Sequence, residues 1–310
     1  MRDLDPFAVP AAQDVAGFMS AVEMLRSRLP ESDWRDLVKK SPVLRAWRFL
    51  LGNDPYTRWG VVKPRGYAGD ATLMDFAYGH RSVQSHIDAS GPVGKAIYAA
   101  TSGAKQSQSA RERIQLIADV IHSAVGVADL SVISVAAGHA RELEVLPEGS
   151  KRRVGSFTAI DLDPVSLQEA ERSAGAIPFS AVRRNAIKDG LGDLSPADLV
   201  YSLGLFDYLT QEHAQAVMEK MLEITCPGGV CIVANLAPDA ANLGYCEAIM
   251  DWWMVTRTER EMSELAWSCR SVQEGRFASS VRRVGCFHYL ELSSTAAPCS
   301  LRATAMEQAG

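Results

Sequence analysis

The sequence predicts an α/β protein with a doubly wound, largely parallel sheet and an N-terminal helical region. Three observations predict it. From Leu130 onward, short apolar strands alternate with amphipathic helices, the pattern of a parallel sheet covered on both faces. Before that point the apolar residues recur only at helical spacing. Near the C-terminus two β-rich runs follow one another without a helix between them, which predicts an antiparallel pair at the sheet edge.

The first region extends from residue 1 to about 125. AQDVAGFMSAVEMLRSRL (12–29) and RDLVKKSPVLRAWRFLL (35–51) have helical spacing of apolar residues, and SGAKQSQSARERIQLIADVIHSAV (102–125) is a third helix. WGVVKPRGYAGDATLMDFAYGH (59–80) contains proline and glycine and cannot be one regular element. We therefore place a domain boundary near residue 125, with a helical region over 1–125 and a sheet domain over 126–310.

The second region predicts a series of strands and helices. The strands are expected at 130–137, 157–162, 181–187, 197–204 and 229–236, with helices at 140–147, 164–175 and 211–225. The antiparallel pair is expected at 279–285 and 286–294. In such a sheet, ligands bind at the carboxyl ends of the strands, so the turns after these strands are the candidate site.

Composition narrows the class of protein. A net charge of −5 and a pI near 5.7 argue against a nucleic-acid partner. No run of about 18 apolar residues is present, so no membrane span is expected. The N-terminus has no apolar segment of a secretory signal, and the cysteines are neither paired nor spaced as zinc ligands, which favours reduced thiols, a cytoplasmic location and no metal. The cysteines are Cys226, Cys231, Cys246, Cys269, Cys286 and Cys299.

VAAGHARE follows the first predicted strand and has the small residues of a ligand-binding turn. Ala136, Ala137, Gly138 and Ala140 would let a ligand approach the backbone, and Gly138 is free to adopt positive φ. A pyrophosphate-binding loop would carry more glycines at the helix N-terminus. An NAD-dependent oxidoreductase is therefore disfavoured, although it shares the predicted sheet.

The ends of the next two strands supply groups suited to a nucleoside. Asp161 ends FTAID, 23 residues after Gly138, where a carboxylate accepts hydrogen bonds from ribose hydroxyls. Asp163 precedes a proline and is expected to cap the next helix instead. Asn185 and Ala186 end the third strand, where they would meet the adenine.

The series VAAGHARE, AIDLDP, RNA, SLGLFDYL and CPGGVCIVANL resembles the class I S-adenosylmethionine-dependent methyltransferases, in the order of that family. The resemblance implies a Rossmann-like sheet ending in an antiparallel strand pair, with S-adenosyl-L-methionine as cofactor. Ser134 departs from the family, which commonly has an acidic residue there, and alanines replace glycines at 136 and 140. The expected cofactor-binding residues are Arg111, Ala136, Gly138, Asp161, Leu162, Asn185, Ala186 and Leu203. For Arg111 and Arg113, a solvated helix face is the alternative; otherwise one of them clamps a carboxylate of the cofactor or substrate.

A closer resemblance covers nearly the whole chain. PRGYAGDATLMDFAY, SARERIQLI, GLFDYL, GGVCIVANLAP and MDWWMVTRTEREM are similar to one bacterial methyltransferase subfamily with an N-terminal helical addition. It includes enzymes of hydroxy-fatty-acid methyl ester synthesis, and the bacterial methionine S-methyltransferases are close to it. The resemblance therefore implies a small acceptor that carries a carboxylate.

Three segments are expected to meet over the transferable methyl group: RGYAGD, LFDY and CEAIMDWWMVTRTERE. The alternative for Asp70 and Asp207 is helix capping, and Arg257 can instead pair with Glu261. If 250–257 is a helix, its two tryptophans cannot share a face, and Trp253 is expected to be the core residue. The expected catalytic residues are Tyr67, Asp207 and Tyr208, and the expected substrate-binding residues are Asp70, Asn235, Tyr245, Asp251, Trp252 and Arg257.

The acceptor class follows from the absence of an evident general base. His139, His213 and His288 are each expected to be structural, and a thioether or carboxylate acceptor carries no proton to remove. Acids, an arginine and aromatic rings suit a small zwitterion and its sulfonium product. We therefore expect S-methylation of L-methionine, with carboxyl methylation of a 3-hydroxy fatty acid as the alternative and a non-catalytic S-adenosylmethionine-binding protein as a further one. The apolar faces of the helical region favour a homodimer.

Overall fold

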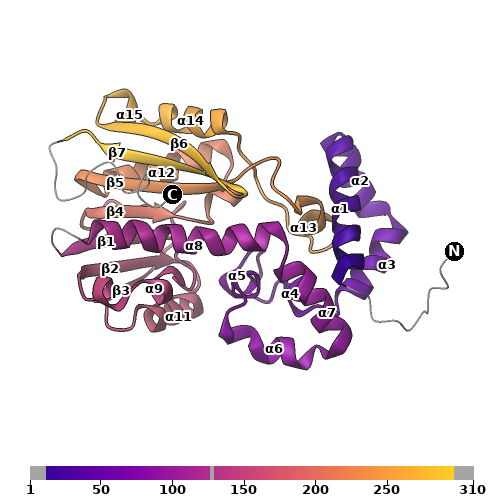
Figure 1. Ribbon diagram of the computed structural model, residues 1–310. Coiled ribbons are helices and arrows are strands. Elements are labelled where there is room, and N and C mark those ends of the chain that lie inside the picture. Colours follow the sequence, from indigo (N-terminus) through magenta and orange to yellow (C-terminus); the bar gives the residue numbers. More distant parts are fainter. Residues whose placement is uncertain (1–11, 126–128, 297–310) are drawn as a thin grey trace. The chain divides into compact units, whose positions relative to one another are not determined.

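The computed structural model describes residues 12–125 and 129–296 (Figure 1), and they divide into two compact units. We call residues 12–111 and 240–253 the helical unit, and residues 112–125, 129–239 and 254–296 the sheet unit. The division differs from a single boundary near residue 125. Residues 112–125 pack with the sheet, and residues 240–253 leave the sheet region of the chain to join the helices.

A seven-stranded sheet is the centre of the sheet unit, with the order β3-β2-β1-β4-β5-β7-β6. β1 to β5 pair with one another in parallel, while β7 runs antiparallel to both β5 and β6. The strands are β1 (Leu130–Val135), β2 (Val154–Asp161), β3 (Phe179–Arg183), β4 (Ala197–Ser202), β5 (Thr225–Leu236), β6 (Phe277–Val284) and β7 (Phe287–Ser294). The predicted α/β sheet with an antiparallel C-terminal pair is confirmed.

The helices of the sheet unit cover a continuous apolar core. On one face, Val200 and Val233 of the central strands pack with Met218 of α12 and Leu265 of α14, all fully buried. In Figure 1, α14 and α15 lie beside β6. The helices are α8 (Lys105–Ala124, which begins in the helical unit), α9 (Glu142–Val145), α10 (Glu148–Lys151), α11 (Pro164–Ala174), α12 (Gln211–Glu223), α14 (Glu259–Ser268) and α15 (Arg270–Gln273), with the 3-10 turn η2 (Phe206–Tyr208).

The helical unit contains the first seven helices, the turn η1 and α13. The predicted helix over 35–51 is interrupted, because Pro42 cannot continue a helix and Ser41 caps the next one by accepting a hydrogen bond from the Leu44 N–H at 3.2 Å. The elements are α1 (Ala12–Arg28), α2 (Glu31–Lys40), α3 (Pro42–Leu51), α4 (Pro55–Val62), α5 (Ala71–Tyr78), η1 (Arg81–Val83), α6 (Gln84–Ala89), α7 (Gly91–Ser102) and α13 (Leu243–Ala248).

Glu247 explains why α13 belongs with the N-terminal helices. Its buried carboxylate accepts hydrogen bonds from Arg26 Nε at 2.8 Å and Arg26 Nη2 at 3.1 Å, a two-pronged ion pair with α1. The indole N–H of Trp34, in α2, donates to the same carboxylate at 2.6 Å. One acidic side chain of α13 thus joins α1 and α2.

A second buried carboxylate, Asp54, organises the other half of the helical unit. It caps α4 by accepting from the Tyr56 and Thr57 backbone N–H groups at 3.0 and 3.1 Å. The Thr57 hydroxyl at 2.7 Å and the Thr101 hydroxyl of α7 at 2.9 Å also donate to it. Burial raises the pKa of Asp54 to about 6, although these hydrogen bonds act in the opposite direction.

The raised pKa of Asp54 predicts a pH-dependent stability. The pKa of Asp54 is higher in the folded state than in the unfolded state. Its contribution to the free energy of unfolding is therefore fully present below about pH 4 and is lost as the pH rises through about 6. Asp54→Asn keeps a cap residue without a titrating group. Urea denaturation at pH 4.5 and 7.5 should therefore show the variant gaining roughly 1–3 kcal/mol relative to the wild type at the higher pH. A difference independent of pH would contradict this expectation.

The cysteines agree with the prediction of reduced thiols over the described residues. Cys226, Cys231, Cys246, Cys269 and Cys286 are free, and all but Cys226 are buried. Cys299 lies outside the described residues. None of the helices in the described part of the chain is both long and apolar enough to cross a membrane.

Candidate functional site

The turn after β1 has an unusual backbone conformation for its sequence. Ala136, Gly138 and Ala140 have φ values of 55°, 56° and 47°, so every second residue is left-handed. Glycine adopts this conformation without strain, whereas an L side chain does so at a cost. The two alanines therefore occupy backbone positions that suit glycine, in agreement with the glycines expected there from the family resemblance.

Asp161 connects this turn to the end of β2. Its Oδ2 accepts a hydrogen bond from the Gly138 N–H at 2.8 Å, and its Oδ1 accepts one from the Asp163 N–H at 2.9 Å. Burial raises the pKa of Asp161, and the two backbone donors act against that change. The predicted helix cap is confirmed at Asp163, which accepts from the Val165 N–H at 3.0 Å.

Glycine substitutions in this turn are expected to change the free energy of unfolding in opposite directions at neighbouring positions. Ala136→Gly and Ala140→Gly are each expected to raise the free energy of unfolding by about 0.5–1 kcal/mol, because they remove left-handed strain. Ala137→Gly is the matched control: its φ is not positive, so it should lower that free energy by about 0.5–1 kcal/mol. Urea denaturation of the single variants measures all three. Equal effects at the three positions would contradict the strain argument.

The remaining sheet-unit residues expected to bind the cofactor lie at the carboxyl ends of β2, β3 and β4. Leu162 is 53% exposed directly after Asp161. Asn185 accepts the Ile187 and Lys188 N–H groups at 3.0 and 3.2 Å and so closes a turn, and Ala186 beside it is buried. The Leu203 carbonyl accepts from the guanidinium of Arg113 at 2.6 Å.

Asp207 and Asn235 form a buried junction at the ends of β4 and β5. Asp207 Oδ1 accepts from the Asn235 side-chain amide at 3.0 Å and from the Leu236 N–H at 2.7 Å. The Asn235 amide also donates to the Val255 carbonyl at 2.8 Å. Asp207 is not the cap of α12, because the Thr210 hydroxyl accepts the His213 N–H at 3.3 Å instead. Tyr208, beside Asp207, is 38% exposed.

Arg257 is the centre of the same junction. Its guanidinium is buried and donates to the carbonyls of Phe206 and Leu209, each at 2.8 Å, and to the side-chain oxygen of Asn235. These contacts hold η2 and the residue after it against the end of β5. The neighbouring segment 251–257 has no regular secondary structure, and Asp251 at its start is left-handed with a φ of 50°, so the helix considered from the sequence is absent.

Burial raises the pKa of Asp207 to about 6, while the guanidinium of Arg113, the Leu236 N–H and the guanidinium of Arg257 act to lower it. Arg113 itself is buried, and its guanidinium lies 4.6 Å from the ring centre of Phe287. Sequence reasoning weighed Arg113 only as a helix-face or clamp residue. Its position between the end of β4 and β7 depends on tertiary packing that no local pattern indicates.

Two further buried polar residues near the carboxyl edge of the sheet had no signal in the sequence. Glu142 accepts a hydrogen bond from the Tyr201 hydroxyl, and burial raises the pKa of Glu142. Within the described residues, the hydroxyl of Ser202, at the last position of β4, is buried with no hydrogen-bond partner. A buried hydroxyl without a partner is uncommon in folded proteins, where an ordered water or another polar group ordinarily supplies one.

In the helical unit, Tyr67 and Asp70 lie in the glycine-containing loop between α4 and α5. Tyr67 is 40% exposed. Asp70 is buried, caps α5 by accepting from the Leu73 N–H at 3.0 Å, and accepts from the Trp59 indole N–H at 2.9 Å. The capping that we considered for Asp70 is therefore present. Arg111 donates to the carbonyls of Ala77 and Ser102, at 2.5 and 3.0 Å.

The other helical-unit residues come from α13 and the segment after it. Tyr245 is buried, with its hydroxyl 2.7 Å from that of Thr57, and the exposed Asp251 accepts from Lys63 Nζ at 2.6 Å. Trp252 is 4% exposed, whereas Trp253 is half-buried with the guanidinium of Arg35 over its ring. The expectation that Trp253 is the core tryptophan was wrong. It rested on helical spacing, which this irregular segment does not have.

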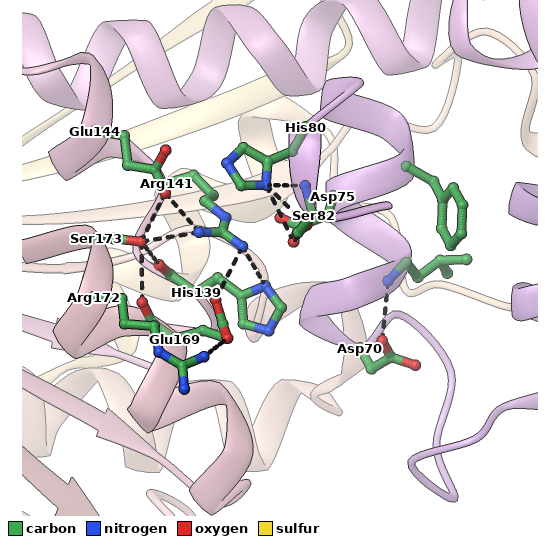
Figure 2. Close-up of polar contacts among 12 residues, drawn as sticks. Asp70, Asp75, His80, Ser82, His139, Arg141, Glu144, Glu169, Arg172 and Ser173 are labelled. Carbon is green, nitrogen blue, oxygen red and sulfur yellow. Dashed lines mark hydrogen bonds and ion pairs between the residues drawn. The ribbon is translucent and has the colours of Figure 1, made fainter. Parts of the chain in front are cut away.

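An Asp–His–Ser cluster in the helical unit has a local structural explanation. Ser82 Oγ donates to Asp75 at 2.6 Å and lies 2.8 Å from His80 Nδ1 (Figure 2). The same nitrogen accepts the Ser82 N–H at 3.2 Å, so it serves as the cap of η1. Since this Nδ1 is used as an acceptor by the backbone, the arrangement is a capped turn rather than an activated nucleophile.

Comparison with known proteins relates the chain to solved structures. No protein-family model matches the sequence, and neither does any curated protein sequence. A possible exported protein from Bordetella parapertussis has a TM-score of 0.55 at 19% identity, with 96% of this chain and 100% of that chain covered. This likeness shows a shared fold over nearly the whole length.

Two methyltransferase structures match a smaller share of the chain with lower scores. Magnesium protoporphyrin IX methyltransferase from Synechocystis PCC 6803 has a TM-score of 0.46 at 12% identity, covering 61% of this chain and 84% of its own. An O-methyltransferase family protein from Burkholderia thailandensis has a TM-score of 0.46 at 16% identity, covering 69% and 63%. The strand order and the antiparallel β7 give the sheet unit the Rossmann-like sheet with an antiparallel C-terminal pair that the sequence predicted.

Proposed function

We propose that this protein is an S-adenosyl-L-methionine-dependent methyltransferase. The observation that carries the proposal is the conformation of the turn after β1. Every second residue of this turn is left-handed, and the carboxylate at the end of β2 accepts a hydrogen bond from the Gly138 N–H. Small side chains there leave the backbone accessible to a ligand, and a carboxylate at the end of β2 suits ribose hydroxyls. The sheet ends in an antiparallel strand pair, as the resemblance to class I methyltransferases implies, and this supports the same function.

The residues present fit this cofactor. Asp161 would bind the ribose. Leu162, Asn185 and Ala186 would surround the adenine. Ala136, Gly138 and Leu203 would line the remainder of the cofactor. We keep Arg111 as a proposed carboxylate contact, although two backbone carbonyls already accept from its guanidinium. The buried hydroxyl of Ser202 offers a further polar contact at the same sheet edge. The sulfonium of the bound cofactor supplies an electrophilic methyl group, and the chain must hold an acceptor in line with it.

For the acceptor we propose L-methionine. A thioether carries no proton to be removed, so no residue need act as a general base. Tyr67, Asp207 and Tyr208 are the proposed catalytic contacts, which position the acceptor. Asp207, with a pKa of about 6, is mostly ionised at neutral pH and suits an ammonium group. The proposed substrate-binding residues are Asp70, Asn235, Tyr245, Asp251, Trp252 and Arg257.

A labelled-methyl assay tests this function. The protein is incubated with S-adenosylmethionine carrying a tritiated methyl group, in parallel with L-methionine and with a 3-hydroxy fatty acid. Label in a cationic, water-soluble small product formed only with methionine is the expected result. Label in a solvent-extractable, alkali-labile ester would instead establish the fatty acid as acceptor. Binding of S-adenosylhomocysteine without transfer to either acceptor would favour the non-catalytic alternative.

A further inference from the structure

A buried polar cluster lies directly beside the turn after β1. Arg141 and Ser173 are each 5% exposed, and they come from the end of the turn and from α11 (Figure 2). Arg141 Nη1 donates to Glu144 Oε1 at 2.6 Å and to Ser173 Oγ at 3.1 Å. Arg141 Nη2 lies 3.3 Å from His139 Nδ1 and 3.7 Å from Glu169 Oε2. A buried guanidinium thus joins the turn to α9 and α11.

The Ser173 hydroxyl holds the backbone of the turn itself. Its oxygen is 2.7 Å from the His139 carbonyl oxygen, and 3.1 Å from both Glu144 Oε1 and the Glu169 carbonyl. A hydroxyl has one hydrogen to donate, and the shortest of these contacts is to His139. The carbonyl between Gly138 and Ala140 is therefore fixed by a side chain of α11.

This contact coincides with the strained part of the turn. Left-handed alanines persist only where the surrounding structure determines the backbone conformation. Asp161 holds Gly138 from the β2 side, and Ser173 with Arg141 holds His139 from the α11 side. The two attachments lie between the left-handed residues Ala136 and Ala140.

We propose that Arg141 and Ser173 are positioning residues that keep residues 136–140 in the conformation that binds the cofactor. The inference rests on the proposed function and adds a determinant of cofactor affinity that does not itself touch the cofactor. We call the contacts of Arg141 and Ser173 with His139 the clamp. Without the clamp, the turn relaxes toward unstrained conformations. The apparent dissociation constant then rises in inverse proportion to the fraction of molecules whose turn remains ready to bind.

Ser173→Ala tests the clamp, with Ser150→Ala as the matched control. Ser150 is also a buried serine of the sheet unit with a side-chain contact, 2.6 Å from His122 Nδ1, but it lies in α10. Calorimetric titration with S-adenosylhomocysteine should show the dissociation constant raised by about 10-fold for Ser173→Ala and by less than about 2-fold for Ser150→Ala. Urea denaturation without ligand should show a similar loss of stability for both, because each removes one buried hydroxyl.

Hydrogen exchange and a second variant distinguish loss of the clamp from a general loss of stability. Amide hydrogen exchange over residues 136–140 should be faster in Ser173→Ala than in Ser150→Ala, even without ligand. Arg141→Lys keeps the charge without the planar fork and should give an intermediate rise in the dissociation constant. Wild-type affinity and wild-type exchange in Ser173→Ala would overturn the clamp. Failure of the wild-type protein to bind S-adenosylhomocysteine at all would overturn the proposed function instead.

Discussion

Replacing Asp161 by alanine is expected to weaken S-adenosylhomocysteine binding by about 100-fold or more, the largest effect we predict on the proposed cofactor site. The substitution removes a carboxylate that would accept charge-assisted hydrogen bonds from ribose hydroxyls, each contributing about 1.5–3 kcal/mol. It also releases the Gly138 and Asp163 N–H groups, which Asp161 holds at 2.8 and 2.9 Å. Isothermal titration calorimetry measures the change.

Asp163→Ala is the control for this prediction. Asp163 is two residues away and also accepts backbone and hydroxyl hydrogen bonds, from Val165 at 3.0 Å and from Ser166 at 2.9 Å, but as the cap of α11. Its loss should lower the free energy of unfolding by about 1 kcal/mol and leave affinity within about 3-fold. Equal affinities for the Asp161 and Asp163 variants would show that the carboxylate at the end of β2 is not a ligand contact.

Replacing Arg257 by methionine is expected to lower the free energy of unfolding by about 3 kcal/mol or more. The guanidinium is buried, and its removal leaves the carbonyls of Phe206 and Leu209 and the amide oxygen of Asn235 without that donor. It also removes a cation that lowers the pKa of Asp207, so that carboxylate becomes harder to ionise. Urea denaturation measures the change in stability.

Arg260→Met provides the comparison for Arg257. Arg260 lies three residues further on, is 87% exposed and pairs with Glu264 across one helical turn. Such a pair contributes little, and the free energy of unfolding should change by less than about 0.5 kcal/mol. If Arg257→Met proves equally harmless but raises KM for the acceptor, Arg257 binds substrate and does not hold the turn.

The sheet was predictable because its signals are local. The apolar runs before VAAGHARE and AIDLDP, and the missing helix between the last two β-rich runs, are visible in the sequence. The cap at Asp163 was predictable for the same reason, since a proline follows it directly. Alanines in place of glycines at 136 and 140 departed from the pattern, yet the backbone there is left-handed as the pattern requires.

The parts that sequence reasoning missed depend on contacts between distant segments. Trp252 is the buried tryptophan, whereas the helical spacing considered for a segment that forms no helix gave the opposite assignment. The contacts of Arg257 with Phe206 and Leu209 cross about fifty residues of sequence, with no periodicity to indicate them. The proposed roles of Tyr67, Tyr208 and Asp251 stay predictions.

The ion pair of Glu247 with Arg26 has a consequence for the order in which the chain matures during synthesis. The two residues are 221 positions apart, so the first helices emerge from the ribosome long before their buried acceptor exists. Contacts at such separation form late and slowly. A separately expressed fragment ending near residue 125 would lack that carboxylate, and its α1 would lose the packing of α13. The N-terminal helices are therefore completed only when nearly the whole polypeptide has been made.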